Sequence, residues 1–347
     1  MTSTEPEPAA AATPAAPAQP TLRDVALAAR VSPMTVSRTL RGDEGVSEAT
    51  RQRVREVARS LGYRPNEVAR NLRLGRSDGL IGLVVTNLAN PFYSQLALGV
   101  EEALAEQGMR VLLGNSGEDP TRERQLVHDF ISRRLDGLVV VPATHHHGHL
   151  GPVQTLGMPV VLAASLPVKV DVDAVLLDDF GGTWEATRHL ISAGHHRIGF
   201  LGLPAATWTG SERYRGYCAA LEEAGIPLSA ELSGYRQRDV AAAEKATEAL
   251  LDLPDPPTAI FAANNRNTIG AYRAIRARGA TTRLAGFDDF ELADSLGLPL
   301  TLVAYDPREL GREAAVLLCD RIAEAGAGAE PGAPRRKVIS TRIVEYG

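Results

Sequence analysis

The stretch TLRDVALAARVSPMTVSRTL, from Thr21 to Leu40, decides the fold of the front of this chain. Thr21 and Asp24 stand three residues apart before an apolar run, a spacing at which two side chains cap the free amides of a helix start. The apolar residues that follow at helical spacing are Leu22, Val25, Ala26 and Ala29. A break then precedes Ser32 and Pro33, which suit the first positions of another helix. The stretch therefore predicts a helix, a tight turn and a second helix.

The second helix has the features of a recognition helix. In the expected register Val36 and Leu40 face inward, which leaves an outer face suited to the major groove of DNA. The residues of that outer face are Pro33, Met34, Thr35, Ser37 and Arg38. A third helix is expected from Ser47, with Gly62 as its left-handed cap. The helical pattern alone leaves open a three-helix cap on an enzyme.

Charge separates this segment from the rest of the chain. Between Thr21 and Arg76 there are twelve Arg and six acidic residues, a net charge of +6, whereas the part after Arg76 carries −9. A basic module gains affinity for DNA by releasing counterions from the phosphates, while an acidic body is repelled. The charge pattern favours DNA binding over the alternative, an arginine-rich helix face that only meets solvent.

These residues resemble the lactose-repressor (LacI/GalR) family of bacterial transcription regulators. The family's V-S-x-x-T-V-S-R pattern is found from Val31 to Arg38, and its Y-x-P-N pattern from Tyr63 to Asn66. The resemblance implies an all-α helix-turn-helix N-terminal domain, at residues 21–64, and an α/β two-lobed effector domain of the type I periplasmic-binding-protein-like fold. It places Pro33 and Met34 at variable base-reading positions. The DNA-contacting residues that it implies are Thr21, Pro33, Met34, Thr35, Ser37, Arg38, Asn66, Val68, Ala69 and Leu72.

Residues 65–78 are expected to form a hinge helix and a linker. The resemblance implies that the segment from Asn66 to Arg73 becomes helical only on operator DNA, and that Leu72 inserts into the minor groove. So short a segment scarcely holds a helix alone, and an inserted apolar side chain unstacks a base step and bends the duplex. Val68, Ala69 and Leu72 would form the apolar face of this helix. A plain linker is the alternative.

Beyond Gly79, apolar strand-like runs alternate with amphipathic helical stretches, the pattern of a parallel, doubly wound sheet. The runs begin with LIGLVV and continue as GLVVV, PVVLAA, AVLL, RIGFLG, TAIFAA and RLAGF. About ten strand candidates exceed what one sheet needs, which favours two lobes with a cleft between them. The expected lobes are Gly79 to Leu176 with the segment after Asp306, and Leu177 to Tyr305. Together they make an effector-binding and dimerisation domain at residues 79–347.

Ligands of open α/β sheets bind beyond the carboxyl ends of the strands. Phe92 and Tyr93 lie after the first strand-like run, and a ring face is what a sugar or base stacks on. The resemblance adds Arg213, in SERYRGY, to grip ligand hydroxyls or a carboxylate, and Asp288, in GFDDF, to accept from hydroxyls. The expected effector-binding residues are Asn90, Phe92, Tyr93, Arg213, Tyr235, Asn264 and Asp288. An ion pair between the lobes is the alternative role of Arg213.

Several positions depart from the family pattern. Ala164 stands where the family's strand ends with an Asp, Asn265 replaces the acid of its N-D pair, and the segment from Ala280 to Arg283 is short. These departures leave the identity of the effector open. A separate feature is a glycine-flanked loop with four histidines: His145, His146, His147 and His149. It has no Cys or carboxylate close in sequence, so we expect a solvated loop rather than a metal site.

The sequence argues against an enzyme. It contains no nucleophile elbow, phosphate-binding P-loop or dinucleotide glycine fingerprint, and no catalytic residue, metal or cofactor is predicted. Residues 1–20, rich in Ala and Pro, are expected to be a disordered tail rather than a signal peptide or membrane span. This disfavours an exported sugar-binding protein. Cys218 and Cys319 are expected to be buried thiols in a reducing cytoplasm.

The resulting expectation is a cytoplasmic transcription regulator, a repressor, with double-stranded operator DNA and a sugar-like effector as its partners. Helix-turn-helix proteins of this kind bind two half-sites with two DNA-binding domains, so a homodimer and a near-palindromic operator are expected. No leucine heptad run that would support a tetramer is present, and no membrane partner is expected. The alternative is a ligand-binding or enzymatic α/β protein with a nonspecific basic helical cap.

Overall fold

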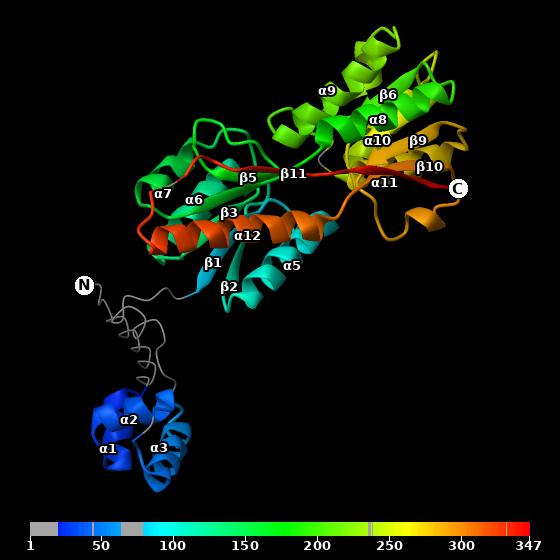
Figure 1. Ribbon diagram of the computed structural model, residues 1–347. Coiled ribbons are helices and arrows are strands. Elements are labelled where there is room, and N and C mark those ends of the chain that lie inside the picture. Colours follow the sequence, from blue (N-terminus) through cyan, green and yellow to red (C-terminus); the bar gives the residue numbers. More distant parts are fainter. Residues whose placement is uncertain (1–19, 44, 64–78, 235–236, 238, 331) are drawn as a thin grey trace, which may run out of the picture. The chain divides into compact units, whose positions relative to one another are not determined.

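The computed structural model describes residues 20–43, 45–63, 79–234, 237, 239–330 and 332–347. The chain divides into two units, Met1–Arg76 and Ser77–Gly347, which Figure 1 draws with the sequence running from blue to red. The hinge positions Asn66, Val68, Ala69 and Leu72, and the effector candidate Tyr235, lie outside the described residues.

The first unit contains three helices, α1 (Leu22–Ala29), α2 (Pro33–Arg41) and α3 (Glu48–Ser60). Their buried apolar residues form one small core: Val25, Ala26, Ala29, Val36, Val54 and Ala58. Leu40 is half-buried and packs against this core, whereas Thr39 is fully buried beside it. The predicted helix–turn–helix is therefore confirmed, with Thr39 added to the inward face of α2.

The start of each helix is set by the side chain that precedes it. Thr21 and Asp24 form the predicted reciprocal cap of α1, and Ser32 accepts from the backbone N–H of Thr35 at the start of α2. Ser47 caps α3 in the same way. Such caps each contribute about 1 kcal/mol to a helix. Gly62 has a φ of 68°, the left-handed conformation predicted for it.

In the second unit, the first lobe is built on a six-stranded parallel sheet with the order β11-β5-β4-β3-β1-β2. Its strands are β1 (Leu80–Val85), β2 (Arg110–Asn115), β3 (Gly137–Val140), β4 (Val160–Ala163), β5 (Asp173–Leu177) and β11 (Arg336–Ile339). Its helices are α5 (Pro91–Glu106), α6 (Pro120–Ser132), α7 (Gly151–Thr155) and α12 (Pro307–Gly326), with a 3₁₀ turn at Gly148–Leu150. The alternation of strand and helix follows the predicted doubly wound pattern.

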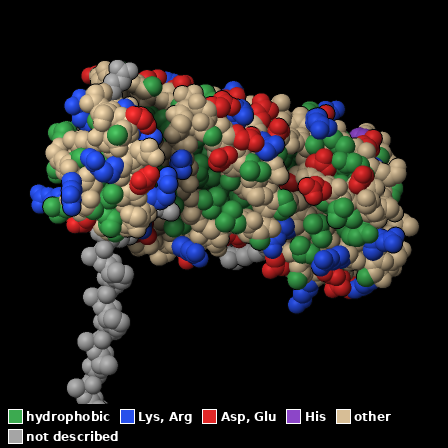
Figure 2. Space-filling view, turned by 90° about the horizontal axis from the view of Figure 1, so that it is seen from below, with side chains coloured by type: hydrophobic (Ala, Val, Ile, Leu, Met, Phe, Trp, Pro, Cys, Tyr) green, Lys and Arg blue, Asp and Glu red, His purple; other side chains and the backbone are tan. Residues whose placement is uncertain are grey.

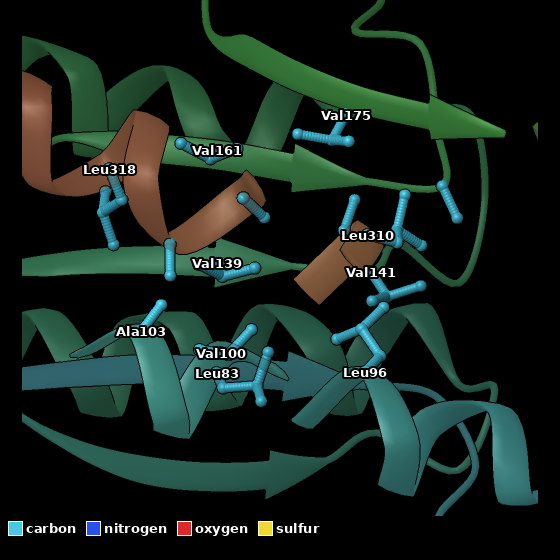
Figure 3. Packing of buried hydrophobic residues seen from close by; sticks show 14 of the residues in the cluster. Leu83, Leu96, Val100, Ala103, Val139, Val141, Val161, Val175, Leu310 and Leu318 are labelled. Carbon is cyan, nitrogen blue, oxygen red and sulfur yellow. The ribbon is translucent and has the colours of Figure 1, made fainter. Parts of the chain in front are cut away.

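One hydrophobic cluster of this lobe lies between the sheet and the helices α5 and α12, and a second includes residues of α6 and α7. Figure 3 shows Leu96 and Val100 of α5 and Leu310 and Leu318 of α12 packed with strand residues such as Val139. The two helices approach closely at glycines: a Cβ built on Gly99 would lie 2.0 Å from the carbonyl oxygen of Arg308, and one built on Gly311 would lie 2.1 Å from that of Leu96. Any larger residue at these crossings would force the helices apart.

The second lobe is built on a six-stranded sheet with the order β12-β10-β9-β8-β6-β7. Its strands are β6 (Ile198–Leu201), β7 (Ser233–Gly234), β8 (Ala259–Ala262), β9 (Arg283–Phe287), β10 (Leu300–Ala304) and β12 (Arg342–Tyr346). Its helices are α8 (Asp179–Ser192), α9 (Trp208–Glu223), α10 (Val240–Leu251) and α11 (Asn265–Arg278), with 3₁₀ turns at Ala230–Leu232 and Ala293–Ser295. Only β12 is antiparallel to its neighbour, β10, among the pairings of the described strands.

The chain passes between the lobes three times in its described part: from β5 to α8, from β10 to α12, and from β11 to β12 (Figure 1). The third passage corrects the predicted lobe division. The whole segment after Asp306 was assigned to the first lobe, but β12 pairs with β10 in the second lobe. This pairing places Leu300 opposite Tyr346. Because the two residues are far apart in the sequence, no local pattern predicts that they pair.

On the face in Figure 2, acidic, basic and apolar side chains alternate over short distances. Exposed ion pairs, such as Arg308 with Glu102 and Arg312 with Glu106, join α12 to α5. Such exposed pairs contribute little individually. Cys218 and Cys319 are free and half-buried, so the expectation that both are buried is only partly met.

Candidate functional sites

The outer face of α2 is accessible. Pro33, Met34 and Arg38 are exposed, with 65% of Met34 open to solvent, while Thr35 and Ser37 are half-buried. Thr35 is fixed at the first turn, where its N–H donates to Ser32 Oγ at 3.1 Å. The fold thus keeps the predicted reading residues on one surface and buries Val36 beneath them.

Thr21 has a capping role besides the DNA contact predicted for it. Its hydroxyl donates to Asp24 Oδ2 at 2.8 Å, and its backbone N–H donates to the same oxygen at 2.7 Å. These hydrogen bonds lower the pKa of Asp24 below its ordinary value. Among the described residues of the first unit, seven arginines are exposed: Arg23, Arg30, Arg38, Arg41, Arg53, Arg55 and Arg59.

A cavity of about 250 Å³ lies between the two lobes of the second unit. The predicted effector residues that line it are Asn90, Phe92, Tyr93, Arg213, Asn264 and Asp288. The prediction missed other lining residues, among them Ser165, Trp208, Arg266 and Tyr305. Trp208 and Tyr305 follow β6 and β10, so their positions after strands were the available signal.

The first-lobe wall carries the aromatic pair. Phe92 and Tyr93 meet edge to face with ring centres 4.9 Å apart, and Phe92 contacts Tyr305 in the same manner at 6.1 Å. Burial raises the pKa of Tyr93 to about 12, so its hydroxyl keeps its proton. Asn90 caps α5 by accepting from the N–H of Phe92 at 3.1 Å. This cap fixes the first turn of α5 and thereby the position of Phe92 beside the cavity.

The second-lobe wall is organised by Arg213, which is only 3% exposed. Its Nε donates to Asp179 Oδ1 at 2.8 Å, and its Nη1 donates to the carbonyl of Ala263 at 2.6 Å and to Asp288 Oδ1 at 3.4 Å. The guanidinium also lies 3.5 Å from the centre of the Phe287 ring. All of these partners belong to the second lobe, so the alternative of an ion pair between lobes is wrong.

Asp288 is held by several donors but is still able to accept more. Oδ1 accepts from Tyr305 at 2.8 Å, and Oδ2 accepts from the N–H of Asn265 at 3.2 Å. Each carboxylate oxygen has two lone pairs, so Oδ2 can accept from a ligand as well. Asp179 lies deeper, and burial raises its pKa to about 6 against the opposing charge of Arg213.

Ala164 and Asp288 occupy corresponding places in the two lobes. Each follows the end of a strand and lines the cavity, and each has a positive φ, 55° for Ala164 and 72° for Asp288. Non-glycine residues in this conformation cost about 1–3 kcal/mol and gather at ligand sites. Ala164 carries no hydrogen-bonding side chain, whereas Asp288 does, so the two walls differ in chemistry.

Hydrogen bonds between described residues join the lobes beside the cavity. Asn265 Nδ2 donates to Asn90 Oδ1 at 2.9 Å, Thr209 Oγ1 donates to the carbonyl of Ala164 at 3.4 Å, and the N–H of His145 donates to the carbonyl of Ala206 at 3.0 Å. The amide that replaces the family's acid at position 265 thus supplies a donor. These contacts make the separation of the lobes depend on residues around the cavity.

The histidine loop is only partly solvated: His146 is exposed and His145 and His149 are half-buried, whereas His147 is buried. His147 is 1% exposed, and His149 Nε2 lies 3.0 Å from the buried carboxylate of Glu123. Glu123 Oε2 also accepts from the N–H of Ala143 at 2.6 Å, which ties α6 to the loop after β3. Contacts with residues distant in sequence bury His147, and nothing in the local sequence predicted these contacts. Among the described residues no group of three metal-binding side chains is found.

The burial of His147 predicts a pH dependence of stability. Burial lowers the pKa of His147 to about 4, from 6.5 in an unfolded chain. As the pH falls, His147 is therefore protonated in the unfolded chain before it is protonated in the folded protein. The contribution of the neutral ring to the free energy of unfolding is complete above pH 6.5 and is lost as the pH falls towards 4. Between pH 7 and pH 4 the wild type should lose about 3 kcal/mol more than His147→Gln. Urea unfolding at several pH values measures the difference, and parallel curves for the two proteins would contradict it.

A three-helix unit with an exposed recognition helix, followed by a two-lobed unit with a cavity, defines a ligand-responsive DNA-binding protein. Residues 21–66 match the lacI family of bacterial regulatory proteins, and residues 78–343 match the periplasmic binding proteins and sugar binding domain of the LacI family. The chain belongs to the LacI family. It is a transcriptional regulator rather than an enzyme.

Similar proteins agree over nearly the whole chain. The HTH-type transcriptional repressor CytR of Escherichia coli K12 is 31% identical over 306 residues, covering 87% of this chain and 89% of CytR. The structure of the transcriptional regulator CelR–cellobiose complex is 32% identical with a TM-score of 0.69, and that of the lac repressor dimer bound to operator and the anti-inducer ONPF is 25% identical with a TM-score of 0.75. Each covers 94% of this chain and 98% of the compared one. Within the described residues, no helix has the length and apolar character needed to cross a bilayer.

Proposed function

We propose that this chain is a cytoplasmic repressor that binds a near-palindromic operator as a homodimer through α2 of each subunit. The exposed face of α2 carries this proposal: Met34 and Arg38 are open to solvent above a buried core, on a unit rich in exposed arginine. Arg38 can donate two hydrogen bonds to a guanine edge, and Met34 offers apolar contact to a thymine methyl group. The dimer of the lac repressor on its operator is a precedent for this arrangement.

The proposed division of labour follows the sequence. Residues 21–64 form the DNA-binding domain, and residues 65–78 connect it to the effector-binding domain. Residues 79–347 bind the effector and form the dimer. The residues proposed to contact DNA are Thr21, Pro33, Met34, Thr35, Ser37, Arg38, Asn66, Val68, Ala69 and Leu72. Those proposed to contact the effector are Asn90, Phe92, Tyr93, Arg213, Tyr235, Asn264 and Asp288. Arg213 orients Asp288 through Nη1, and its Nε donor is engaged by Asp179, so Nη2 is the group proposed to contact the effector.

The effector is proposed to be a sugar or a related small metabolite. The cavity combines a carboxylate able to accept from hydroxyls with aromatic rings on the facing lobe, Phe92 and Tyr93. Carbohydrates present both hydroxyls and a flat C–H face, which these groups match. The relative CelR binds cellobiose in the structure that this chain resembles. Binding of the effector changes the separation of the lobes and thereby the affinity for the operator.

Selection from a pool of random DNA duplexes at moderate salt tests the proposed DNA partner. The purified full-length chain should enrich a palindrome whose half-sites lie about one helical turn apart, or a multiple of this, around a deformable central step. Retention of DNA without any shared sequence would contradict the proposal and leave only a nonspecific basic surface.

Leu72→Ala tests the proposed wedge, a residue outside the described part of the chain. Insertion between base pairs occurs only at the specific site, so specific affinity should fall about tenfold or more while nonspecific affinity stays nearly constant. Titration of the selected operator and of a scrambled duplex at the same salt concentration gives both values. Equal losses for the two duplexes would rule out the wedge.

A further inference from the structure

The buried ring of His147 lies directly behind the first-lobe wall of the cavity. The N–H of Val168 donates to His147 Nδ1 at 3.0 Å, so this nitrogen carries a lone pair and no proton. The ring is buried and neutral, and the proton of a neutral imidazole must then sit on the other nitrogen. His147 Nε2 is therefore a donor, and it faces Ser165 Oγ at 3.4 Å.

This protonation state fixes the role of the Ser165 hydroxyl. Because Nε2 already carries a proton, Ser165 cannot donate to His147 and its oxygen accepts instead. No other partner of this hydroxyl is found among the described residues. Ser165 lines the cavity and is itself only 3% exposed, so its O–H group is directed into the cavity. His147 thus turns Ser165 into a directed hydrogen-bond donor. The same geometry rules out His147 as a base that activates Ser165.

The neighbouring residue reinforces this chemistry. Ala164 has no polar side chain, and its carbonyl already accepts from Thr209 at 3.4 Å. At this corner the first-lobe wall therefore offers the Ser165 hydroxyl as its directed donor, with the Thr209 hydroxyl of the other lobe beside it. The opposite wall offers the carboxylate of Asp288, an acceptor. The residues that follow β4 and β9 therefore differ in chemistry, with the Ser165 donor on the first lobe and the Asp288 acceptor on the second.

We propose that Ser165 is a specificity-determining residue, positioned by His147, that donates a hydrogen bond to a carbonyl oxygen of the effector. This inference rests on the proposed effector site and specifies its ligand: a polyol whose hydroxyls meet Asp288 and whose carbonyl, as in a sugar lactone, meets Ser165. A carbonyl oxygen accepts from Ser165 with no proton of its own to place, whereas a hydroxyl at this corner must also find an acceptor, such as Thr209 Oγ1 or the Ala164 carbonyl.

The first test requires no ligand. In the full-length chain labelled with ¹⁵N-histidine, long-range proton–nitrogen spectra should show His147 as the neutral Nε2–H form from pH 7.5 down to pH 5.5. His147→Gln assigns the signals. A ring protonated on Nδ1, or one that becomes an imidazolium in this range, would overturn the proposal, because Ser165 would no longer be held as a donor by an Nε2–H.

The second test measures the binding of matched probes, ribose with ribono-1,4-lactone and galactose with galactono-1,4-lactone, by calorimetry. The wild type should prefer a lactone to its sugar, and Ser165→Ala should reduce the lactone affinity about five- to tenfold, the effect of one neutral hydrogen bond. Ser116→Ala is the matched control, because Ser116 is buried in the same lobe and its hydroxyl donates to the carbonyl of Val85. This control should keep the wild-type preference, and thermal unfolding should show that both variants fold.

The outcomes separate the two proposals. Probes that bind Ser165→Ala and the wild type with the same lactone-to-sugar ratio would overturn the role of Ser165 and leave the sugar-like effector standing. A preference for the sugars over the lactones would also overturn it. Failure of every probe to bind would count against the sugar-like effector and, with it, against this assignment.

Discussion

Arg38→Ala should reduce operator affinity about a hundredfold while the chain still folds and dimerises. A bidentate contact between arginine and guanine contributes about 1–3 kcal/mol of discrimination, and a dimer contains two such contacts. Arg38 is exposed on α2, so its truncation removes no core packing. Binding of the selected operator and of a scrambled duplex, measured by fluorescence anisotropy at one salt concentration, gives the specific and nonspecific components.

Arg55→Ala is the matched control for this prediction. Arg55 is also exposed but lies on α3, and its loss removes the same charge. It should weaken specific and nonspecific binding to a similar, smaller extent, as expected of a charge that interacts only with phosphates. If Arg38→Ala behaved like Arg55→Ala, α2 would not be the element that reads the sequence.

Arg213→Met should lower the free energy of unfolding of the second unit by about 3–5 kcal/mol. Removal of one partner from a buried ion pair leaves the other charge without compensation. Here two carboxylates, Asp179 and Asp288, would lose the guanidinium, and the ring of Phe287 would lose its stacked partner. Denaturant unfolding monitored by tryptophan fluorescence measures the loss.

Arg188→Met is the control for the charge change. Arg188 stacks on Trp184 and lies 3.7 Å from Glu223, but about half of its side chain is exposed. Its replacement should cost less than about 1 kcal/mol. A loss of similar size at Arg213 would mean that the buried network does not hold the second-lobe wall in place.

The parts of the structure that the sequence predicted well depend on local chemistry. The spacing of Thr21 and Asp24, and Ser32 before Pro33, set helix starts through contacts within one turn. Strands such as β1 and β8 were recognisable because they are short apolar runs buried in a parallel sheet. The segments after β1, β8 and β9, including the first turn of α5, contained most of the predicted cavity residues.

The parts that escaped prediction depend on contacts between distant residues. Asn265 and Asn90 are 175 residues apart, and nothing near either one indicates a hydrogen bond between the lobes. The edge strand β12 has little apolar alternation, and only pairing with β10 assigns it to the second lobe. His147 is buried by its partners Val168 and Ser165, which lie about twenty residues further along the chain.

Operator affinity, measured with the cavity empty and with it saturated, tests the central claim most directly. The selected operator would be titrated with the full-length chain, alone and with the sugar or lactone that binds it most tightly. Coupling between two sites of this kind is commonly 1–3 kcal/mol, so the dissociation constant should change about 5- to 150-fold, whichever its direction. An unchanged constant at saturating ligand would contradict the account, because it would mean that the cavity and the DNA-reading helix act independently.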